Sequence, residues 1–408
     1  MRTQRFNLGG IIAVVCAALS ASIIASAADQ PAGPQVSKAL AKPLKAAQDD
    51  LQAKKLDDAL AKIKAVQALP GDKSAYDNFV INQDLLYIYV QKQDFVSAIP
   101  SLEALTQQSQ YGTPELQKTW FKALFGIYFQ NKNYAKTVDV GQELIKRGYA
   151  DAETYKTLGD SQKKLGNLKE AAAMIEQITA HQDKPDENLL LFQWNCYVEA
   201  KDDADGQKVL DKLVIFYPKP DYWLNALVPL RRMDVKDSRL QLNIYRLMSE
   251  VGALRLPSDY ADMAEVALNL GFPGETVSVL QEAFQKNVFT EQREKDRYQH
   301  LLDGAKQRAA ADQPALSKSQ PPDGNATVQL GAAYMTYGQN DQAVTAIAKG
   351  IQMGSLKSPD DANLLLGIAQ LRAKNNAEAL RSFDKVKTSS NPGYAQLARL
   401  WALHASAH

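Results

Sequence analysis

The sequence is poor in the residue types that most often carry out chemistry. Among its 408 residues are only two cysteines and four histidines. No histidine falls in a His-Glu-x-x-His spacing, and the chain has no Gly-x-Ser-x-Gly elbow and no glycine-rich phosphate loop. Cys16 lies in the amino-terminal apolar run, so the rest of the chain holds only Cys196, which we interpret as a buried small hydrophobic residue. These absences predict a protein that is not an enzyme and that binds no metal or cofactor.

The sequence also lacks an excess of charge of either sign. Its 47 lysines and arginines balance 46 aspartates and glutamates, for a formal net charge of +1. A protein that binds nucleic acid generally presents a basic surface to the phosphates. We therefore expect no nucleic acid among its partners.

Only the amino terminus holds a long apolar run. Arg2 and Arg5 precede an uncharged stretch that ends in Ala25-Ser26-Ala27, the pattern of a secretory signal peptide. We therefore predict a signal peptide at residues 1–27, cleaved before Ala28, and a flexible linker at 28–39. An uncleaved membrane anchor is the alternative, since the stretch is nearly long enough to span a bilayer. Export, with a single cysteine in the mature chain, predicts a bacterial periplasmic location.

What the sequence does contain is a twelve-residue spacing that recurs eight times. In its clearest copies a small residue is followed twelve positions later by another, as in Gly159 and Ala171, Gly331 and Ala343, Gly367 and Ala379, and Ala47 and Ala59. Apolar residues tend to follow the second member at four and seven positions. This pattern predicts two antiparallel helices that touch at the small residues, with one apolar stripe on the second helix.

The units built on this spacing start near residues 40, 79, 118, 152, 187, 220, 257, 324 and 360, and we expect a degenerate unit near 291. They resemble the tetratricopeptide repeat, whose period is 34 residues. The clearest unit contains Tyr155, Leu158-Gly159, Leu165-Gly166-Asn167 and Ala171. The resemblance implies an all-α, right-handed superhelical solenoid of about nine or ten helical hairpins with a concave groove.

Two segments depart from the pattern. The unit that starts at 220 has no small partner residue, and the run from Arg231 to Asp237 lengthens its turn instead. The segment 309–323 is rich in proline and alanine and lacks the apolar stripe. We interpret it as a break between a main array at 40–308 and carboxy-terminal repeats with a capping helix at 324–408. The alternative is one irregular repeat in a continuous solenoid.

The resemblance also places candidate partner-binding residues, because the first helices of tetratricopeptide units line the concave face. This rule predicts a groove lined by Gln83, Tyr87, Lys122, Phe129, Lys156, Asp160, Lys163 and Asn195. Such a mixed surface suits an extended or helical peptide. The alternative is that these residues are solvated and that a partner uses the convex face or an edge. Tyr222 and Trp223 lie at a proline-rich junction between units and serve either as a packing staple or, if exposed, as a recognition anchor.

A narrower resemblance concerns two segments. The run from Trp120 to Tyr134 and the run from Pro218 to Trp223 are similar to periplasmic tetratricopeptide proteins encoded beside TonB–ExbB–ExbD systems in proteobacteria. That resemblance implies an accessory of active transport across the outer membrane, which acts by contact with other envelope proteins. An accessory scaffold for outer-membrane or cell-wall assembly is the alternative.

Overall fold

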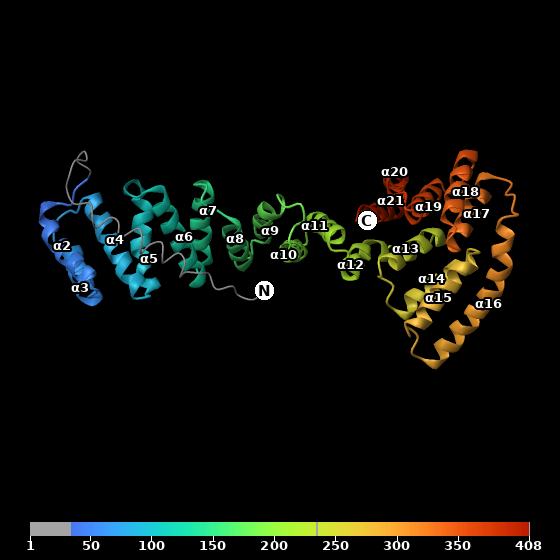
Figure 1. The fold of residues 1–408 in the computed structure, drawn as a ribbon, viewed down its shortest axis with the longest axis horizontal. Helices are drawn as coiled ribbons and strands as arrows, with labels where there is room; N and C mark the ends of the chain where they lie inside the picture. Colours follow the sequence, from blue (N-terminus) through green and yellow to red (C-terminus); the bar gives the residue numbers. More distant parts are fainter. Residues whose placement is uncertain (1–33, 234–235, 408) are drawn as a thin grey trace. The chain divides into compact units, whose positions relative to one another are not determined.

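The computed structural model describes residues 34–233 and 236–407, and every regular element of these residues is a helix (Figure 1). The all-α class is therefore confirmed. The predicted signal peptide at 1–27 and the first residues of the predicted linker lie outside the described residues, and the first helix of the described residues begins at Lys38.

Most helices come in successive pairs that are joined by short turns. In chain order the pairs are α2 (Lys38–Gln52) and α3 (Leu56–Ala68), α4 (Ala75–Gln91) and α5 (Phe95–Gln107), α6 (Pro114–Gln130) and α7 (Tyr134–Lys146), α8 (Ala152–Lys164) and α9 (Leu168–Thr179), α10 (Glu187–Glu199) and α11 (Asp203–Phe216), α12 (Pro220–Arg231) and α13 (Ser238–Glu250), α14 (Pro257–Asn269) and α15 (Pro273–Gln285), α17 (Gly324–Thr336) and α18 (Asn340–Met353), and α19 (Pro359–Arg372) and α20 (Asn376–Lys387). The 3-10 helix η1 (Ser109–Tyr111) precedes α6, α16 (Gln292–Leu316) precedes α17, and α21 (Pro392–Ser406) ends the fold. The predicted unit starts thus fall within a few residues of helix starts.

The turns within the pairs share one backbone conformation. In eight of the nine described pairs, the middle residue of a three-residue turn has a positive φ, whether it is a glycine such as Gly166 or a lysine such as Lys132. The left-handed conformation lets the chain reverse directly after the helix ends. The exception is the turn after Arg231, which runs to Asp237 and confirms the predicted lengthening.

The small residues meet where the paired helices cross. A Cβ atom added to Gly331 would lie 2.9 Å from the backbone nitrogen of Ile347 and 3.0 Å from the backbone oxygen of Ala343. Ala171, Ala343 and Ala379 are completely buried. The twelve-residue spacing is therefore the distance along the chain between the two contacting positions of a pair.

The prediction of a degenerate helical pair near residue 291 was wrong. Residues 292–316 form one 25-residue helix, α16, which packs against α15 and α17 instead of pairing with a second helix of its own. This helix runs through the first half of the segment 309–323, which we interpreted as a break. Its alanine-rich sequence favours helix, and Pro314 lies close to its end, where only the last turn is affected.

The chain forms two compact units. Unit 1 contains the described residues up to Asp183 together with Asn195–Lys201, and unit 2 contains Lys184–Trp194 and the described residues from Asp202 onwards. Residues of α10 therefore belong to both units. Within unit 1, helices α2–α9 pack on their neighbours in chain order, and the core consists of successive apolar clusters around residues such as Ile63, Leu102 and Leu144.

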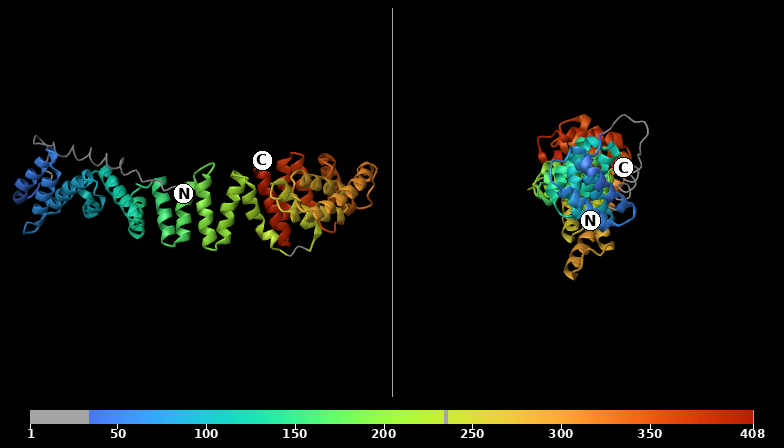
Figure 2. Two further views of the ribbon diagram at one scale, coloured as in Figure 1. Left: turned by 90° about the horizontal axis from the view of Figure 1, so that it is seen from below. Right: turned by 90° about the vertical axis from the view of Figure 1, so that its left-hand side faces the viewer.

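Unit 2 is closed by its last helix. Helix α21 packs not only against α19 and α20 but also against α11, α12 and α13, which precede it by well over a hundred residues (Figures 1 and 2). Arg399 of α21 binds Asp211 of α11 through one of its nitrogens, at 2.7 and 2.6 Å from the two carboxylate oxygens. Trp401 is fully buried between Phe383 and His404. The start and the end of unit 2 therefore share one core.

Candidate partner-binding surfaces

The predicted groove residues of unit 1 lie on successive first helices. They are Gln83 and Tyr87 on α4, Lys122 and Phe129 on α6, Lys156, Asp160 and Lys163 on α8, and Asn195 on α10. Asn195 is exposed and the other seven are half-buried. They therefore remain accessible in part, which a partner-binding surface requires, although solvated residues would show the same exposure.

Two of the predicted lysines form ion pairs with the next first helix. Lys122 of α6 binds Asp151, the residue that caps the amino terminus of α8. Lys163 of α8 lies 2.6 Å from Glu199 of α10. The same side chains that we assigned to the groove thus also connect consecutive pairs. The lysine side chains of the two pairs are 24% and 29% exposed and the carboxylates 52%, so solvent screens both ion pairs in part.

The carboxylates beside these lysines differ in their electrostatic environment. Burial acts to raise the pKa of Asp151, but the hydrogen bonds from Lys122 and Thr154 outweigh it and hold the pKa at about 2. Burial raises the pKa of Asp160, and the nearby positive charge of Lys164 offsets this only in part. The surface of α8 therefore carries one firmly ionised carboxylate at its start and one less acidic carboxyl further along.

The predicted aromatic residues have packing roles as well. Tyr87 packs against the apolar cluster that contains Ile63 and Ile81. The rings of Phe129 and Tyr134 meet edge to face, with centroids 6.1 Å apart. Only the remaining exposed part of each ring is free to contact a partner.

Tyr222 and Trp223 are buried, so the prediction that they form an exposed recognition anchor was wrong. Trp223 is 1% exposed and its ring packs against His404 of α21. Tyr222 is 8% exposed, and its hydroxyl donates a hydrogen bond of 2.5 Å to Glu187, which also binds Lys219. Trp223 therefore packs against the helix that closes unit 2, and Tyr222 connects α12 to α10, so the structure supports the packing-staple alternative.

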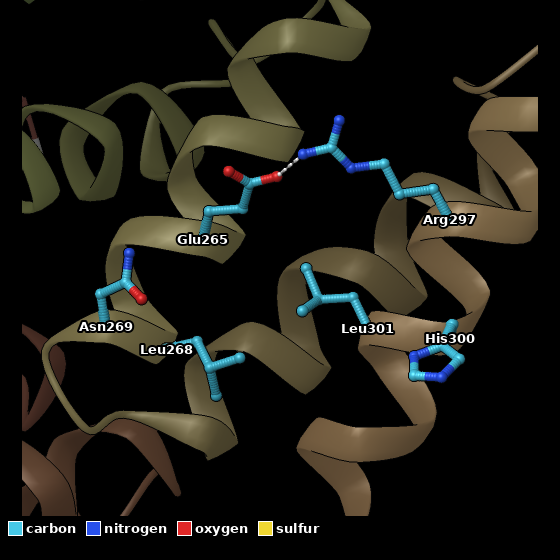
Figure 3. A pocket seen from close by; sticks show the side chains of 6 residues that line it. All are labelled: Glu265, Leu268, Asn269, Arg297, His300 and Leu301. Atoms are coloured by element: carbon cyan, nitrogen blue, oxygen red, sulfur yellow. Dashed lines mark hydrogen bonds and ion pairs between the residues drawn. The ribbon is translucent and has the colours of Figure 1, made fainter.

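Unit 2 contains a groove that was not predicted from the sequence. Helices α14 and α16 flank a pocket of about 570 Å³, lined by Glu265, Leu268, Asn269, Arg297, His300 and Leu301 (Figure 3). The side chains of Leu268 and Leu301 extend from the two helices into the space between them. Arg297 closes one end with an ion pair of 2.7 Å to Glu265. The pocket is a depression that is open to solvent, not an enclosed cavity.

Among the described residues, no group of three or more histidine, cysteine, aspartate or glutamate side chains is arranged to hold a metal ion. Cys196 is buried, and burial raises the pKa of its thiol to about 11, which leaves it unreactive. Within residues 34–233 and 236–407, no helix has both the length and the apolar character of a membrane span.

No family model and no curated protein matches the chain. Among solved structures it is similar to a tetratricopeptide repeat protein from Parabacteroides merdae, at 13% identity over 79% of this chain and 98% of that one, with a TM-score of 0.27. It is also similar to the TPR domain of P58(IPK), at 13% identity over 89% and 97% of the two chains and a TM-score of 0.22. The Cut9–Hcn1 hetero-tetramer of the APC/C gives 11% identity over 82% and 68%, with a TM-score of 0.23. These TM-scores are too low for the likenesses to support any argument about partners.

Proposed function

We propose that this chain is a non-enzymatic scaffold that binds a protein or peptide partner through its repeated helices. The observation that carries the proposal is the surface of α4, α6 and α8 in unit 1. There, consecutive first helices present aromatic, amide and lysine side chains that are accessible in part, and the ion pair of Lys122 with Asp151 connects α6 to the start of α8. A row of such groups at regular intervals suits a partner that lies along several helices.

We further propose that the scaffold acts in the periplasm as an accessory of TonB-dependent energy transduction and outer-membrane transport. The signal-peptide pattern at residues 1–27 supports the location. The resemblance of the runs Trp120 to Tyr134 and Pro218 to Trp223 to proteins encoded beside TonB–ExbB–ExbD systems supports the role. The expected partners are accordingly TonB, ExbB, ExbD or an outer-membrane receptor.

The location is tested by cell fractionation and sequencing of the mature amino terminus. We expect the protein in the periplasmic fraction, with Ala28 as its first residue. Recovery in the membrane fraction with Arg2 retained would instead establish an uncleaved anchor. Recovery in the cytoplasm would contradict the proposed compartment.

The partner is tested by cross-linking in intact cells. A photo-reactive amino acid is placed at Phe129 or Asn195, on first helices, and as a control at Lys146, an exposed residue of the second helix α7. We expect Phe129 and Asn195 to capture the same envelope protein and Lys146 to capture none. Capture from Lys146 alone would place the contact on another face. If cell-wall enzymes or outer-membrane assembly proteins are captured in place of TonB components, the alternative role in envelope assembly is supported. Capture of no protein would contradict the scaffold proposal.

A matched pair of charge reversals sharpens this test. Lys122→Glu reverses a predicted groove residue, whereas Lys146→Glu makes the same change in charge on α7. We expect both variants to fold, because each change removes one ion pair at the surface of the fold, and such a pair contributes about 0–1 kcal/mol. Partner capture should fall in Lys122→Glu and stay unchanged in Lys146→Glu. Equal capture by the two variants would exclude Lys122 from the binding surface.

A further inference from the structure

We propose that the uncovered side of α2, at the amino-terminal end of unit 1, binds an acidic helical segment of a partner protein. The surface consists of a row of lysines on α2 and of an apolar hollow between α2 and α3. It is separate from the predicted groove on α4, α6 and α8. The inference rests on the proposed scaffold function and adds to it a second binding surface and the chemistry of its ligand.

The later first helices of unit 1 show how this side of a first helix is used in the array. Leu85 of α4 lies in the apolar cluster of α2 and α3, and Leu124 of α6 lies in the cluster of α4 and α5. Both leucines belong to rows that pack back against the preceding pair: Ile81, Leu85 and Ile88 on α4, and Trp120, Leu124 and Ile127 on α6. The interval that separates the two rows also takes Ala47 of α2 to Leu86 of α4, so α2 can be compared with them position by position.

In α2 the corresponding row is charged and uncovered. Lys42, Ala46 and Asp49 take the places of the three apolar residues of α4, and Lys45 takes the place of Asp84. The three charged residues are exposed and Ala46 is half-buried. Among the described residues no helix precedes α2, which packs chiefly against α3 and α4 (Figure 1). The side that receives a preceding pair in α4 and α6 is therefore open to a partner in α2.

An apolar hollow lies beside this row. It is open to solvent, has a volume of about 310 Å³, and is lined by Pro43, Ala46, Lys62, Ala65, Val66 and Leu69. Val66 is buried, whereas Leu69 is 41% exposed. The charge of Lys62 is already engaged by Asp50. The hollow can therefore receive an apolar side chain of a partner.

The row of lysines determines the charge of that partner. Lys38, Lys42 and Lys45 follow one another at spacings of four and three residues, so they lie on one side of α2. All three are exposed, and their side chains form no ion pair or hydrogen bond within the part of the chain that the structure describes. Lys42 and Lys45 directly precede Pro43 and Ala46, so the row runs along the hollow. Carboxylates on a partner would complement these charges.

The aspartates of the first pair do not cancel the charge of the row. Two of them form ion pairs elsewhere, Asp50 with Lys62 and Asp57 with Lys92 of α4. Others have lysines near them in the chain: Asp49 and Asp58 lie on either side of Lys54 and Lys55, and Asp72 precedes Lys73. From Lys38 to Asp77 the chain holds eight lysines and six aspartates, and Asp77 is completely buried. The surface therefore keeps an excess of positive charge.

The array itself favours a helix as the occupant. A polar outer side keeps any terminal pair soluble, but charges of either sign would serve that purpose, and no apolar hollow is needed. In the later repeats of unit 1 the equivalent place is filled by helices of the preceding pair. A helix with carboxylates on one side and an apolar side chain on the adjacent side would therefore extend the array by one element.

Peptide binding to the purified full-length mature protein tests the inference. The probe is a fluorescein-labelled helical peptide with glutamate on one side and leucine and alanine on the adjacent side. The comparison peptide has lysine at each glutamate position. Binding is followed by fluorescence polarisation at low salt, where charge interactions are least screened. We expect the glutamate peptide to bind more tightly than the lysine peptide. Equal or reversed preference, or no saturable binding, would overturn the inference.

Two matched charge reversals locate the site. Lys42→Glu changes the row on α2, whereas Lys64→Glu makes the same change on α3, at an exposed residue whose charge acts on Asp94 of the next pair. We expect Lys42→Glu to weaken binding of the glutamate peptide about fivefold, as reversal of one exposed charge implies. Lys64→Glu should leave the affinity unchanged. Equal affinities of the two variants would place the peptide elsewhere and overturn the assignment.

A steric pair checks the hollow independently of charge. Ala65 is exposed and lines the hollow, so Ala65→Trp fills it, and Ala65→Ser leaves it open. Binding should be lost in the first variant and kept in the second, with the same helical content by circular dichroism in both. In the unmodified protein the bound peptide should also slow hydrogen exchange in α2 and α3. Unchanged binding to Ala65→Trp would overturn the inference.

Two other occupants would give distinct results. Vesicles of phosphatidylglycerol that bind the protein when the peptide does not, and that bind Lys42→Glu more weakly, would assign the row to an anionic membrane surface. Self-association in sedimentation that Ala65→Trp abolishes would assign the hollow to a second copy of the chain. Either result would overturn the inference.

The scaffold proposal is tested separately. Cross-linking from Phe129 and Asn195 reports on the predicted groove, whatever the peptides do. If the peptide fails to bind while capture from these positions persists, only the surface on α2 is removed. If capture is lost while the peptide binds, the predicted groove is removed instead.

Discussion

In unit 1, hydrogen bonds such as the one from Ser37 to Asp77 join neighbouring helix pairs, 40 residues apart, whereas in unit 2 Arg399 binds Asp211 across 188 residues. Both units are made of the same kind of helix pair. The difference lies in α21, which connects the end of unit 2 to its beginning. In a repeat array that is open, stability is a sum of local terms, and the terminal pairs open most easily. Closure replaces that behaviour with a shared core.

The same difference appears in the buried polar groups. In unit 2, Arg246 is 2% exposed and binds Glu275 with two hydrogen bonds of 2.7 and 2.6 Å. Asn243 accepts from Arg246 and donates to Asp361 of α19 at 2.8 Å, which ties the middle of the unit to its end. In unit 1 the buried Asp84 accepts one hydrogen bond of 3.2 Å, from Gln48 of α2. The buried polar groups of unit 2 thus connect helices far apart in the chain, whereas the buried Asp77 and Asp84 of unit 1 accept hydrogen bonds only from their own or the neighbouring helix pair.

The largest expected effect comes from breaking the closure. Trp401→Ala empties a fully buried position of α21 and should cost unit 2 about 3–5 kcal/mol of its free energy of unfolding. The matched control is Trp120→Ala in unit 1, where the tryptophan is 2% exposed. Hydrogen exchange along a urea gradient, read by mass spectrometry, follows each unit separately. We expect Trp401→Ala to lose protection from exchange throughout α11–α13, and Trp120→Ala to keep it there. Loss of protection confined to α20 and α21 in Trp401→Ala would contradict a shared core.

Buried carboxyls provide the next contrast. Burial raises the pKa of Asp84 to about 7, and only the hydrogen bond from Gln48 opposes this. At Asp361 in unit 2 burial also raises the pKa, but Arg239 and Arg246 offset part of the effect and the pKa reaches about 6. The folded state thus holds the Asp84 proton more tightly than the unfolded state does. Stability of unit 1 should therefore fall as the pH rises from about 4 to 7 and level off above it.

Asp84→Asn removes this titration and should leave the hydrogen bond from Gln48 in place. At pH 8 we expect it to stabilise unit 1 by up to about 4 kcal/mol, the equivalent of a shift of about three pKa units. At pH 4 the variant and the parent should be alike. Pulse proteolysis in urea at the two pH values measures the difference. A variant that is less stable than the parent at pH 8 would contradict the assignment.

The close contacts within pairs are compared by adding one methyl group. In Gly331→Ala the new carbon meets backbone atoms of Ile347 and Ala343, which cannot move aside, so we expect a loss of about 1–3 kcal/mol in unit 2. In Gly159→Ala in unit 1 the new carbon would lie 3.2 Å from the end of the Ile175 side chain and 3.3 Å from the backbone oxygen of Ala171. These contacts are looser than those at Gly331, so the loss should be smaller. Thermal unfolding of the two variants gives the ranking. The reverse order would show that the helices cross elsewhere.

The smallest expected effect concerns the turns. Lys132 in unit 1 and Lys374 in unit 2 have φ values of 58° and 63°, a conformation that costs less for glycine. Each change to glycine should stabilise its own unit by up to about 1 kcal/mol. The reciprocal change, Gly166→Ala at φ 85°, should destabilise unit 1 by a similar amount. Urea titration detects these shifts, and a loss of stability in both lysine variants would contradict the shared turn geometry.

The helix pairs were predictable because their signals are local. Gly159 and Ala171 are twelve residues apart and set one contact, and glycine or proline at the ends limits each helix. The single helix α16 was missed because Pro314 and the alanines before it resemble a linker, whereas alanine in fact favours helix and a proline in the last turn costs little. Arg297 and Leu301 of α16 were readable in the sequence, but they line a pocket only because α14 lies opposite.

The closure of unit 2 was not predictable in the same way. Arg399 and Asp211 each look like an ordinary surface charge on a helix, and nothing in their local sequence connects them. Their meeting depends on the sum of small angles between many successive pairs, which side-chain packing sets. The same limit applies to Tyr222 and Trp223, because aromatic residues beside two prolines fit an exposed anchor and a buried staple equally well. Trp223 is buried by its contact with α21, and Tyr222 by its contact with Glu187 of α10.

Native-state hydrogen exchange of the unmodified protein tests the difference between the units most directly. If α21 closes unit 2, peptides from α12, α13 and α21 should exchange slowly and through one common opening, while in unit 1 the pair α2–α3 should exchange faster than α6. Exchange of α21 well ahead of α12 and α13 would show that the last helix is only an appended cap. That result would contradict the account of unit 2 as a closed core.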